Sequence, residues 1–158
     1  MPVGEALPET SLVLDNNILT AWRYQKPGIR EAIAAYQSRV KLLPALTSIT
    51  VFEALSGFEN SVVKTGIVSE QTAQDRIRTE KLINSCVVLP FDQASAEIAA
   101  YIIPRLSRNI PKDTLQDALI AATALAHGYG VATRDKGFAL IGEHTPGHLT
   151  LRLALWSP

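Results

Sequence analysis

The chain contains 158 residues, of which 47% are hydrophobic and 19% are charged, and its 15 lysines and arginines balance its 15 aspartates and glutamates. This composition excludes an intrinsically disordered chain, and the zero formal net charge excludes a bulk attraction to nucleic acid or to an anionic membrane. We therefore expect one globular domain over residues 1–158, in which a polyanion is bound by a local patch or through metal ions.

Cysteine content and the N-terminal sequence indicate in which cellular compartment the protein resides. The single cysteine, Cys86, excludes an internal disulfide and is typical of a reducing environment. Residues 1–10 have neither a basic region nor a long apolar core, so we expect an irregular lead-in and no signal peptide. No stretch approaches the roughly 18 apolar residues of a spanning helix. The sequence thus predicts a cytoplasmic protein that does not associate with a membrane.

In the first half of the chain, apolar runs alternate with helical patterns. Residues 11–15 are apolar on both faces, as in a buried parallel strand. Residues 41–47 form a weaker strand candidate, because Pro44 cannot donate a ladder hydrogen bond. We expect helices at residues 18–25, 28–40 and 49–65, with Thr47 or Ser48 as the N-cap of the third.

The second half continues this alternation. Ser69 and Asp92 are suited to cap two further helices, and residues 86–91 between those helices predict a third buried strand. Residues 131–133 and 148–155 are the last strand candidates. Strands separated by helices predict an α/β domain with a largely parallel sheet.

The last long helix is expected to begin with a capping box and to pack through one stripe. Asp113 and Gln116 have the spacing of that box, and Gly128 and Gly130 end the pattern. The expected core stripe follows i, i+3, i+4 spacing and consists of Leu115, Ala118, Leu119, Ala122, Leu125 and Ala126.

Four acidic residues are expected to meet at the carboxyl edge of this sheet. Asp15 and Asp135 directly follow predicted strands, whereas Glu53 and Asp117 fall early in predicted helices. Neighbouring carboxylates repel one another unless some are protonated or a divalent cation neutralises them. Hard oxygen ligands favour Mg²⁺ or Mn²⁺, and such a site is suited to metal-assisted phosphodiester hydrolysis by a metal-bound water.

The same four segments resemble the motifs of the PIN domain, a nuclease family, and particularly its VapC-type toxin members. LVLDNNIL matches the first motif and supplies Asp15, and TSITVFEAL matches the second and supplies Glu53. LQDALIAATALAHG supplies Asp117, and VATRDKGF supplies Asp135. The resemblance extends over residues 12–155, and four motifs in this order form a specific pattern.

This resemblance implies a five-stranded parallel sheet flanked by helices on both sides, with Mg²⁺ or Mn²⁺ held by the four acids. It also implies endoribonuclease activity on RNA, a homodimer, and a cognate antitoxin that silences the enzyme. Two positions depart from the family pattern. Gly137 stands where many relatives carry another acid, and Asn16 stands where many carry Thr or Ser. The first departure favours an alternative, a catalytically weakened PIN-like module that binds RNA or protein.

Several neighbouring residues are candidates for contacts with the substrate. Asn16 and Thr133 are suited to orient a carboxylate or a ligand, and Arg134 and Lys136 are suited to contact RNA phosphates. Arg23 and Lys26 are the other basic residues near the motifs, and Trp22 and Tyr24 are either base-stacking or core residues. A dehalogenase-type phosphatase is disfavoured, because that class carries Asp-x-Asp where residues 15–17 are Asp-Asn-Asn.

Overall fold

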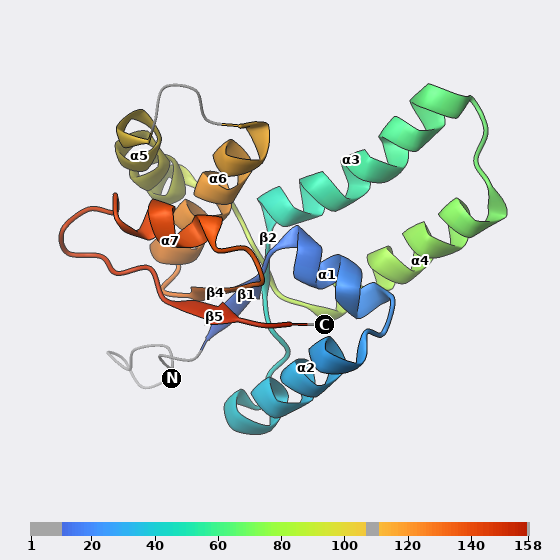
Figure 1. Ribbon diagram of the computed structural model, residues 1–158, viewed down its shortest axis with the longest axis horizontal. Coiled ribbons are helices and arrows are strands. Elements are labelled where there is room, and N and C mark those ends of the chain that lie inside the picture. The colour runs from blue at the N-terminus through green and yellow to red at the C-terminus, as the bar shows by residue number, and fades with distance from the viewer. Residues whose placement is uncertain (1–10, 107–110, 158) are drawn as a thin grey trace.

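The computed structural model describes residues 11–106 and 111–157 (Figure 1). The expected lead-in over residues 1–10 lies outside the described residues. The strands are β1 (Leu12–Leu14), β2 (Leu46–Thr47), β3 (Val88–Leu89), β4 (Gly130–Thr133) and β5 (Leu153–Leu155). They form two ladders, with the orders β1-β4-β5 and β2-β3, and every pairing is parallel.

A single parallel bridge between Val13 and Ala45 joins the two ladders. The Leu14 N–H donates to Ala45 O at 2.9 Å, and the Ala45 N–H donates to Leu12 O at 3.0 Å. Pro44, which precedes this bridge, has no N–H with which to extend the pairing. The α/β class is confirmed, but the described strands form sheets of three and two strands and not one regular five-stranded sheet.

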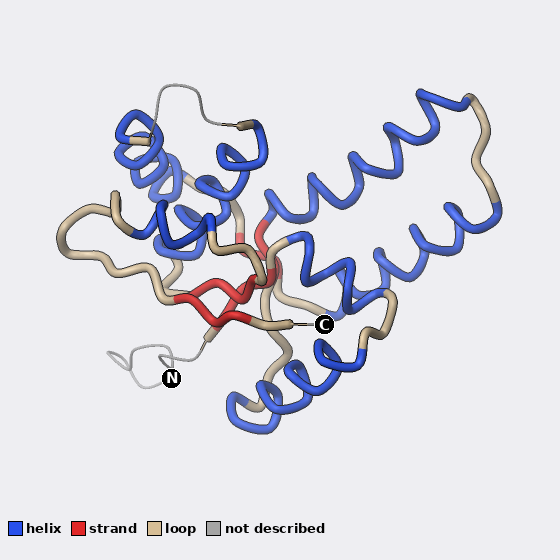
Figure 2. Tube along the Cα trace, viewed as in Figure 1, coloured by secondary structure: helices blue, strands red, loops and turns tan. Residues whose placement is uncertain are grey.

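Helices cover both faces of the three-stranded sheet (Figures 1 and 2). They are α1 (Asn16–Arg23), α2 (Pro27–Val40), α3 (Ser48–Thr65), α4 (Glu70–Ser85), α5 (Gln93–Ile102), α6 (Lys112–Ala126) and α7 (Gly137–Gly142), with a short 3₁₀ turn at Ile103–Arg105. Helices α3 and α4 extend away from the sheet as a helical hairpin (Figure 1). None of the helices described has the length and apolar character needed to cross a membrane.

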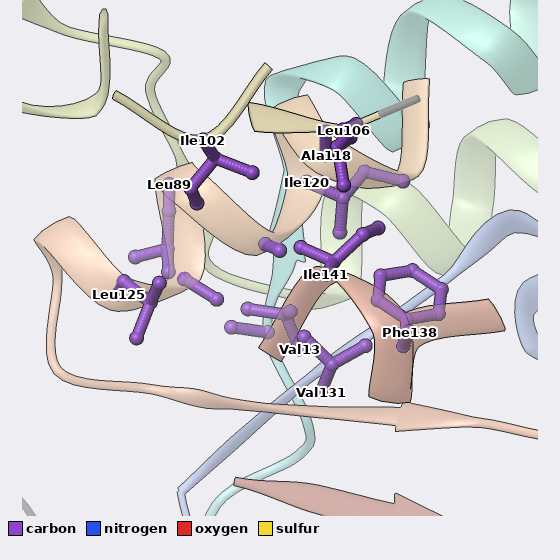
Figure 3. Packing of buried hydrophobic residues seen from close by; sticks show 13 residues of the cluster. Val13, Leu89, Ile102, Leu106, Ala118, Ile120, Leu125, Val131, Phe138 and Ile141 are labelled. Atoms are coloured by element: carbon purple, nitrogen blue, oxygen red, sulfur yellow. The ribbon is translucent and has the colours of Figure 1, made fainter. Parts of the chain in front are cut away.

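The alternation of side chains along β1 and β4 divides the core into two clusters. On one face, Val13 and Val131 pack with side chains of α5, α6 and α7, including Phe138 and Ile141 (Figure 3). On the other face, Leu12, Leu14 and Ala132 pack with buried side chains of α1 and α2, among them Ile18, Trp22, Ile29 and Tyr36. Both clusters fix the carboxyl ends of β1 and β4 relative to the helices that follow them.

Three of the expected helix caps are confirmed. Thr47 Oγ1 accepts the Thr50 N–H, Ser69 Oγ accepts the Thr72 N–H, and Asp92 Oδ1 accepts the Ser95 N–H. The expected Asp113–Gln116 capping box is wrong. Helix α6 begins at Lys112 after Pro111, and no side chain caps it. Asp113 therefore lies inside the first turn, where its charge favours the helix dipole.

Two packing expectations are also wrong. Over the predicted buried strand 86–91, only Leu89 is buried, while Val87 and Val88 are 62% and 37% exposed. The strand that forms, β3, contains only two residues and lies at the edge of its ladder. Helix α6 does not bury a single stripe. Leu115 is 38% exposed, whereas Ile120 and Ala121 are fully buried outside the predicted stripe, since α6 contacts α3, α5 and α7 on different sides. The last strand is shorter than predicted, and residues 138–141 lie in α7.

One buried hydrogen bond between α2 and β1 gives a direct test of the fold. The Leu12 N–H donates to Tyr36 Oη at 3.0 Å. We predict that Tyr36→Phe lowers the free energy of unfolding by about 1–3 kcal/mol, because the buried Leu12 N–H loses its acceptor. Urea denaturation measures this loss. The control Tyr101→Phe, at a tyrosine that is 37% exposed, should change stability by less than about 0.5 kcal/mol. Equal losses for both variants would contradict the account.

Candidate functional site

Two of the expected acids lie at the ends of adjacent parallel strands. Asp15 is the first residue after β1, and Asp135 is the second residue after β4. The two strands are paired so that Leu14 lies opposite Ala132. The Asp15 N–H continues the ladder by donating to Ala132 O at 3.2 Å. The strand pairing therefore presents both acids at the carboxyl edge of the sheet, where open parallel sheets bind their ligands.

Asp15 is held in place by two hydrogen bonds inside the protein. Its side chain is only 3% exposed, and Oδ1 accepts the Ile18 N–H at 2.9 Å, which caps α1. Its Oδ2 accepts a hydrogen bond from Thr133 Oγ1. Burial raises the pKa of Asp15 above its usual value, while the bonds from Thr133 and Ile18 act in the opposite direction. The carboxylate is thus fixed in orientation and costly to ionise.

Glu53 on α3 and Asp117 on α6 complete the group of four. Burial and then the negative charge of Asp15 raise the pKa of Glu53 to about 7. Burial and then Asp135, Asp15 and Glu53 raise the pKa of Asp117 to about 7. The four acids therefore lie close enough to influence one another. Without a cation, the Glu53 and Asp117 carboxyls therefore keep their protons to a much higher pH than an ordinary carboxyl does.

Thr133 connects the two strand-end acids. Besides its bond to Asp15, Thr133 Oγ1 accepts the Asp135 N–H at 2.9 Å, and Asp135 Oδ1 accepts the Gly137 N–H at 2.8 Å. Thr133 is fully buried, so its hydroxyl orients the carboxylates from within the protein. Asp135, Arg134 and Lys136 are exposed on the loop that follows.

The donor set is suited to a divalent cation. All four side chains offer hard oxygen atoms, which Mg²⁺ and Mn²⁺ prefer. Glu53 Oε1 is buried and has no hydrogen-bond partner, so a cation would satisfy an oxygen that the protein leaves unpaired. Within residues 11–106 and 111–157, no three acidic, histidine or cysteine side chains form a ready-made metal cage. Full convergence of like charges is not expected before a cation neutralises them.

A polar cluster beside Glu53 was not predicted from the sequence. Arg23 on α1 donates to Thr79 Oγ1 on α4 at 3.1 Å, and Asp75 and Thr79 are both buried. Helix α4 is mostly polar, and these two residues belong to the face that packs on α1. The i, i+4 spacing of Asp75 and Thr79 is the only sequence signal for the face that packs on α1. Asn16, expected near the site, lines the same cavity as Arg23 and Glu53.

Comparison with models of known protein families identifies the family to which the chain belongs. A model of the PIN domain matches residues 12–143, well over half of the chain, and the protein therefore belongs to the PIN domain family, whose members are generally nucleases. The resemblance found in the four motifs is confirmed. A comparison with curated proteins finds no match.

Several solved structures of toxin–antitoxin complexes have the same fold. VapBC2 from Rickettsia felis, bound to a promoter DNA fragment, has a TM-score of 0.72 at 17% identity and covers 94% of this chain and 100% of that chain. DNA-bound VapBC from Salmonella typhimurium has a TM-score of 0.68 at 24% identity, covering 94% and 99%. A VapBC family member from Mycobacterium tuberculosis has a TM-score of 0.59 at 21% identity, with the same coverage. At these identities the likeness concerns the fold.

The bridging hydroxyl of Thr133 can be tested by removing it. We predict that Thr133→Val lowers divalent-ion affinity about 10–100-fold, because Asp15 loses the group that orients it. Calorimetric titration with Mn²⁺ measures this change. The control Thr123→Val removes a buried hydroxyl that bonds only Leu119 O on its own helix, and should leave the affinity unchanged. Equal Mn²⁺ affinity in wild type and Thr133→Val would contradict an orienting role.

The raised pKa of Asp117 predicts a pH-dependent stability in the absence of divalent ions. Its pKa is about 7 in the folded chain and close to 3.8 when unfolded. Between about pH 4 and pH 7 the folded chain therefore holds more protons, and stability falls as pH rises. Asp117→Asn should flatten this fall and add on the order of 1–3 kcal/mol of stability at pH 8.

Denaturation in EDTA from pH 4 to pH 8 measures this dependence. Glu97→Gln, at an exposed acid on α5, is the control and should follow the wild-type curve. If Asp117→Asn also follows the wild-type curve, folding does not raise the pKa of Asp117.

Proposed function

We propose that this PIN domain is a Mg²⁺- or Mn²⁺-dependent endoribonuclease and the toxin of a type II toxin–antitoxin pair. The observation that carries the proposal is that Asp15 and Asp135 lie at one sheet edge, joined through Thr133, while Glu53 Oε1 beside them is buried without a partner. The residues that would hold the ion are Asp15, Glu53, Asp117 and Asp135. When bound, a divalent ion would polarise water and phosphate and stabilise negative charge during phosphodiester hydrolysis.

The chain's own residues prepare and surround this site. Thr133 holds Asp15 in one orientation, and the α1 N-terminus fixes the other oxygen of the same carboxylate. Without an ion, the Glu53 and Asp117 carboxyls hold protons near neutral pH, so ion binding would displace those protons. Arg134 and Lys136 are exposed beside Asp135, and we assign them to phosphates of the RNA backbone.

The toxin assignment rests on the likeness to VapBC complexes. We propose a cognate antitoxin as partner, a homodimer as the toxin's own assembly, and the cytoplasm as the compartment of action. Expression of the chain alone should arrest growth, and co-expression of the neighbouring reading frame should relieve the arrest. Harmless expression would remove the toxin role and leave the nuclease proposal standing.

A second candidate is a PIN-like module with weakened catalysis. Gly137 favours it, because Asp135 is the only acid in the last motif and its Oδ1 accepts the Gly137 N–H. A Cβ added at Gly137 would lie 3.2 Å from Asp135 Oδ1, so an acid there would crowd Asp135. A weakened module should bind no Mn²⁺ tightly, whereas the nuclease should bind the ion with an affinity that depends on the four acids.

Removal of single carboxylates tests the nuclease most simply. We predict that Asp15→Asn and Asp117→Asn each reduce RNA cleavage in Mg²⁺ by at least about 100-fold, because losing a ligand should exceed the 10–100-fold cost of losing an outer-shell partner. Asparagine still caps α1, so Asp15→Asn should fold.

Cleavage of labelled RNA gives the rate, and circular dichroism verifies the fold of each variant. Glu97→Gln, at an exposed acid on α5, is the control and should cleave like the wild type. Undiminished cleavage by both site variants would rule out the proposed assignment.

A further inference from the structure

A cavity of about 310 Å³ opens beside Glu53 between α1, α3 and α4. Its polar lining includes Asn16, Arg23, Glu53, Ser61 and Asp75, and its apolar lining includes Phe58. This volume lies at the lower end of the range of small-molecule sites, about 300–1,000 Å³. It suits one compact planar group and is too small for a helix or a strand of a partner.

Two orphaned polar atoms belong to residues that line this cavity. Across the described parts of the chain, Arg23 Nε and Glu53 Oε1 are the buried side-chain nitrogen and oxygen atoms without a hydrogen-bond partner. A buried polar atom without a partner is destabilising, so it favours a ligand that supplies one. Glu53 Oε1 has a role in the proposed ion site. Arg23 Nε has none there, so its N–H is left for an acceptor on another molecule.

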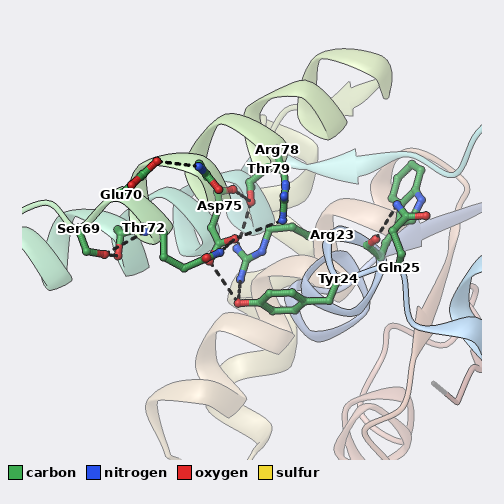
Figure 4. Close-up of polar contacts among 12 residues, drawn as sticks. Arg23, Tyr24, Gln25, Ser69, Glu70, Thr72, Asp75, Arg78 and Thr79 are labelled. Carbon is green, nitrogen blue, oxygen red and sulfur yellow. Dashed lines mark hydrogen bonds and ion pairs between the residues drawn. The ribbon is translucent and has the colours of Figure 1, made fainter.

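Two hydrogen bonds and two aromatic rings hold the Arg23 guanidinium in one orientation; Figure 4 shows the hydrogen bonds. Nη1 donates to Thr79 Oγ1 at 3.1 Å, and Nη2 donates to Tyr24 Oη at 3.1 Å. The guanidinium carbon lies 4.6 Å from the centroid of the Tyr24 ring and 5.3 Å from that of Phe58. These contacts fix the orientation of Nε before any ligand arrives, which lowers the entropic cost of binding.

The charges around the cavity disfavour a phosphate. One arginine is accompanied by two acids, Glu53 and Asp75, so the lining carries no net positive charge. A neutral planar group that offers hydrogen-bond acceptors suits it better, with Phe58 as an apolar wall and hydroxyl and amide groups around it. Guanine offers two adjacent acceptors, O6 and N7, which are the atoms that arginine contacts most often on a base.

We propose that this cavity receives one unpaired base of the RNA substrate, preferentially guanine, next to the phosphate that is cut. The proposal rests on the proposed nuclease function, because Glu53 belongs both to the acidic group and to the cavity wall. Arg23 Nε donates to the base and thereby makes cleavage depend on sequence.

A substitution at Gly57 tests the cavity better than one at Arg23, because Arg23 also forms a hydrogen bond between α1 and α4 that stabilises the fold. Gly57 lines the cavity in the middle of α3, and an added Cβ would meet no atom within 4 Å. Gly57→Leu should therefore fill the cavity without disturbing the fold, and Gly57→Ala should fill it partly. Asn60→Leu, at an exposed position on the same helix, is the matched control because Asn60 does not line the cavity.

The experiment compares two labelled single-stranded RNA pentamers, five uridines and the same pentamer with a central guanosine. Fluorescence anisotropy in Mg²⁺ measures their affinities for the Asp117→Asn protein and for its Gly57→Leu, Gly57→Ala and Asn60→Leu derivatives. We expect about tenfold tighter binding of the guanosine pentamer. Gly57→Leu should reduce this ratio to about one, Gly57→Ala should reduce it partly, and Asn60→Leu should preserve it.

Equal binding of both pentamers, or a ratio that Gly57→Leu leaves unchanged, would overturn the proposal. Unchanged RNA binding together with weakened binding of the co-expressed antitoxin would assign the cavity to the partner protein instead. Guanosine-dependent binding that Gly57→Leu removes, in a protein whose wild-type form cleaves no RNA, would support the base cavity and refute the nuclease. The two failures are therefore distinguishable.

Discussion

The parallel pairing of β1 with β4 is the constraint on which the rest of the site depends. It places Asp15 and Asp135 at one edge of the sheet, and the Thr133 hydroxyl contacts both residues. The two core clusters hold α1 against one face of this pair and α6 against the other. As a result, acids from segments far apart in the chain meet in a partly buried region, where water screens their repulsion less than it does in bulk solution.

This repulsion connects the fold to the proposed activity. An acid whose pKa burial raises, such as Glu53 or Asp117, costs stability once it ionises. A bound divalent cation would stabilise the ionised carboxylates, because they would then be its ligands, and the repulsion between them would be neutralised. The unpaired oxygen of Glu53 and the two hydrogen bonds that orient Asp15 are features suited to a site that an ion completes.

The sequence predicted those parts of the site that depend on local structure. Asp15 was assigned because a buried strand ends beside it, and caps such as Ser69 follow from hydrogen bonds that span three residues. The Arg23–Thr79 contact joins residues 56 positions apart, and no periodicity indicates such a pair. The burial of α6 on several sides and the exposure of Val88 also follow from how elements pack, which one segment alone does not encode.

Anomalous diffraction from crystals soaked in Mn²⁺ tests the central claim most directly, because it locates the ion without relying on activity. The account predicts a peak at the carboxyl edge of β1 and β4, at coordination distance, about 2.0–2.2 Å, from oxygens of at least two residues of the group of four. Asp15→Asn crystals should lose the peak. A well-ordered site without Mn²⁺ in wild-type crystals, or a peak bound elsewhere, would contradict the account.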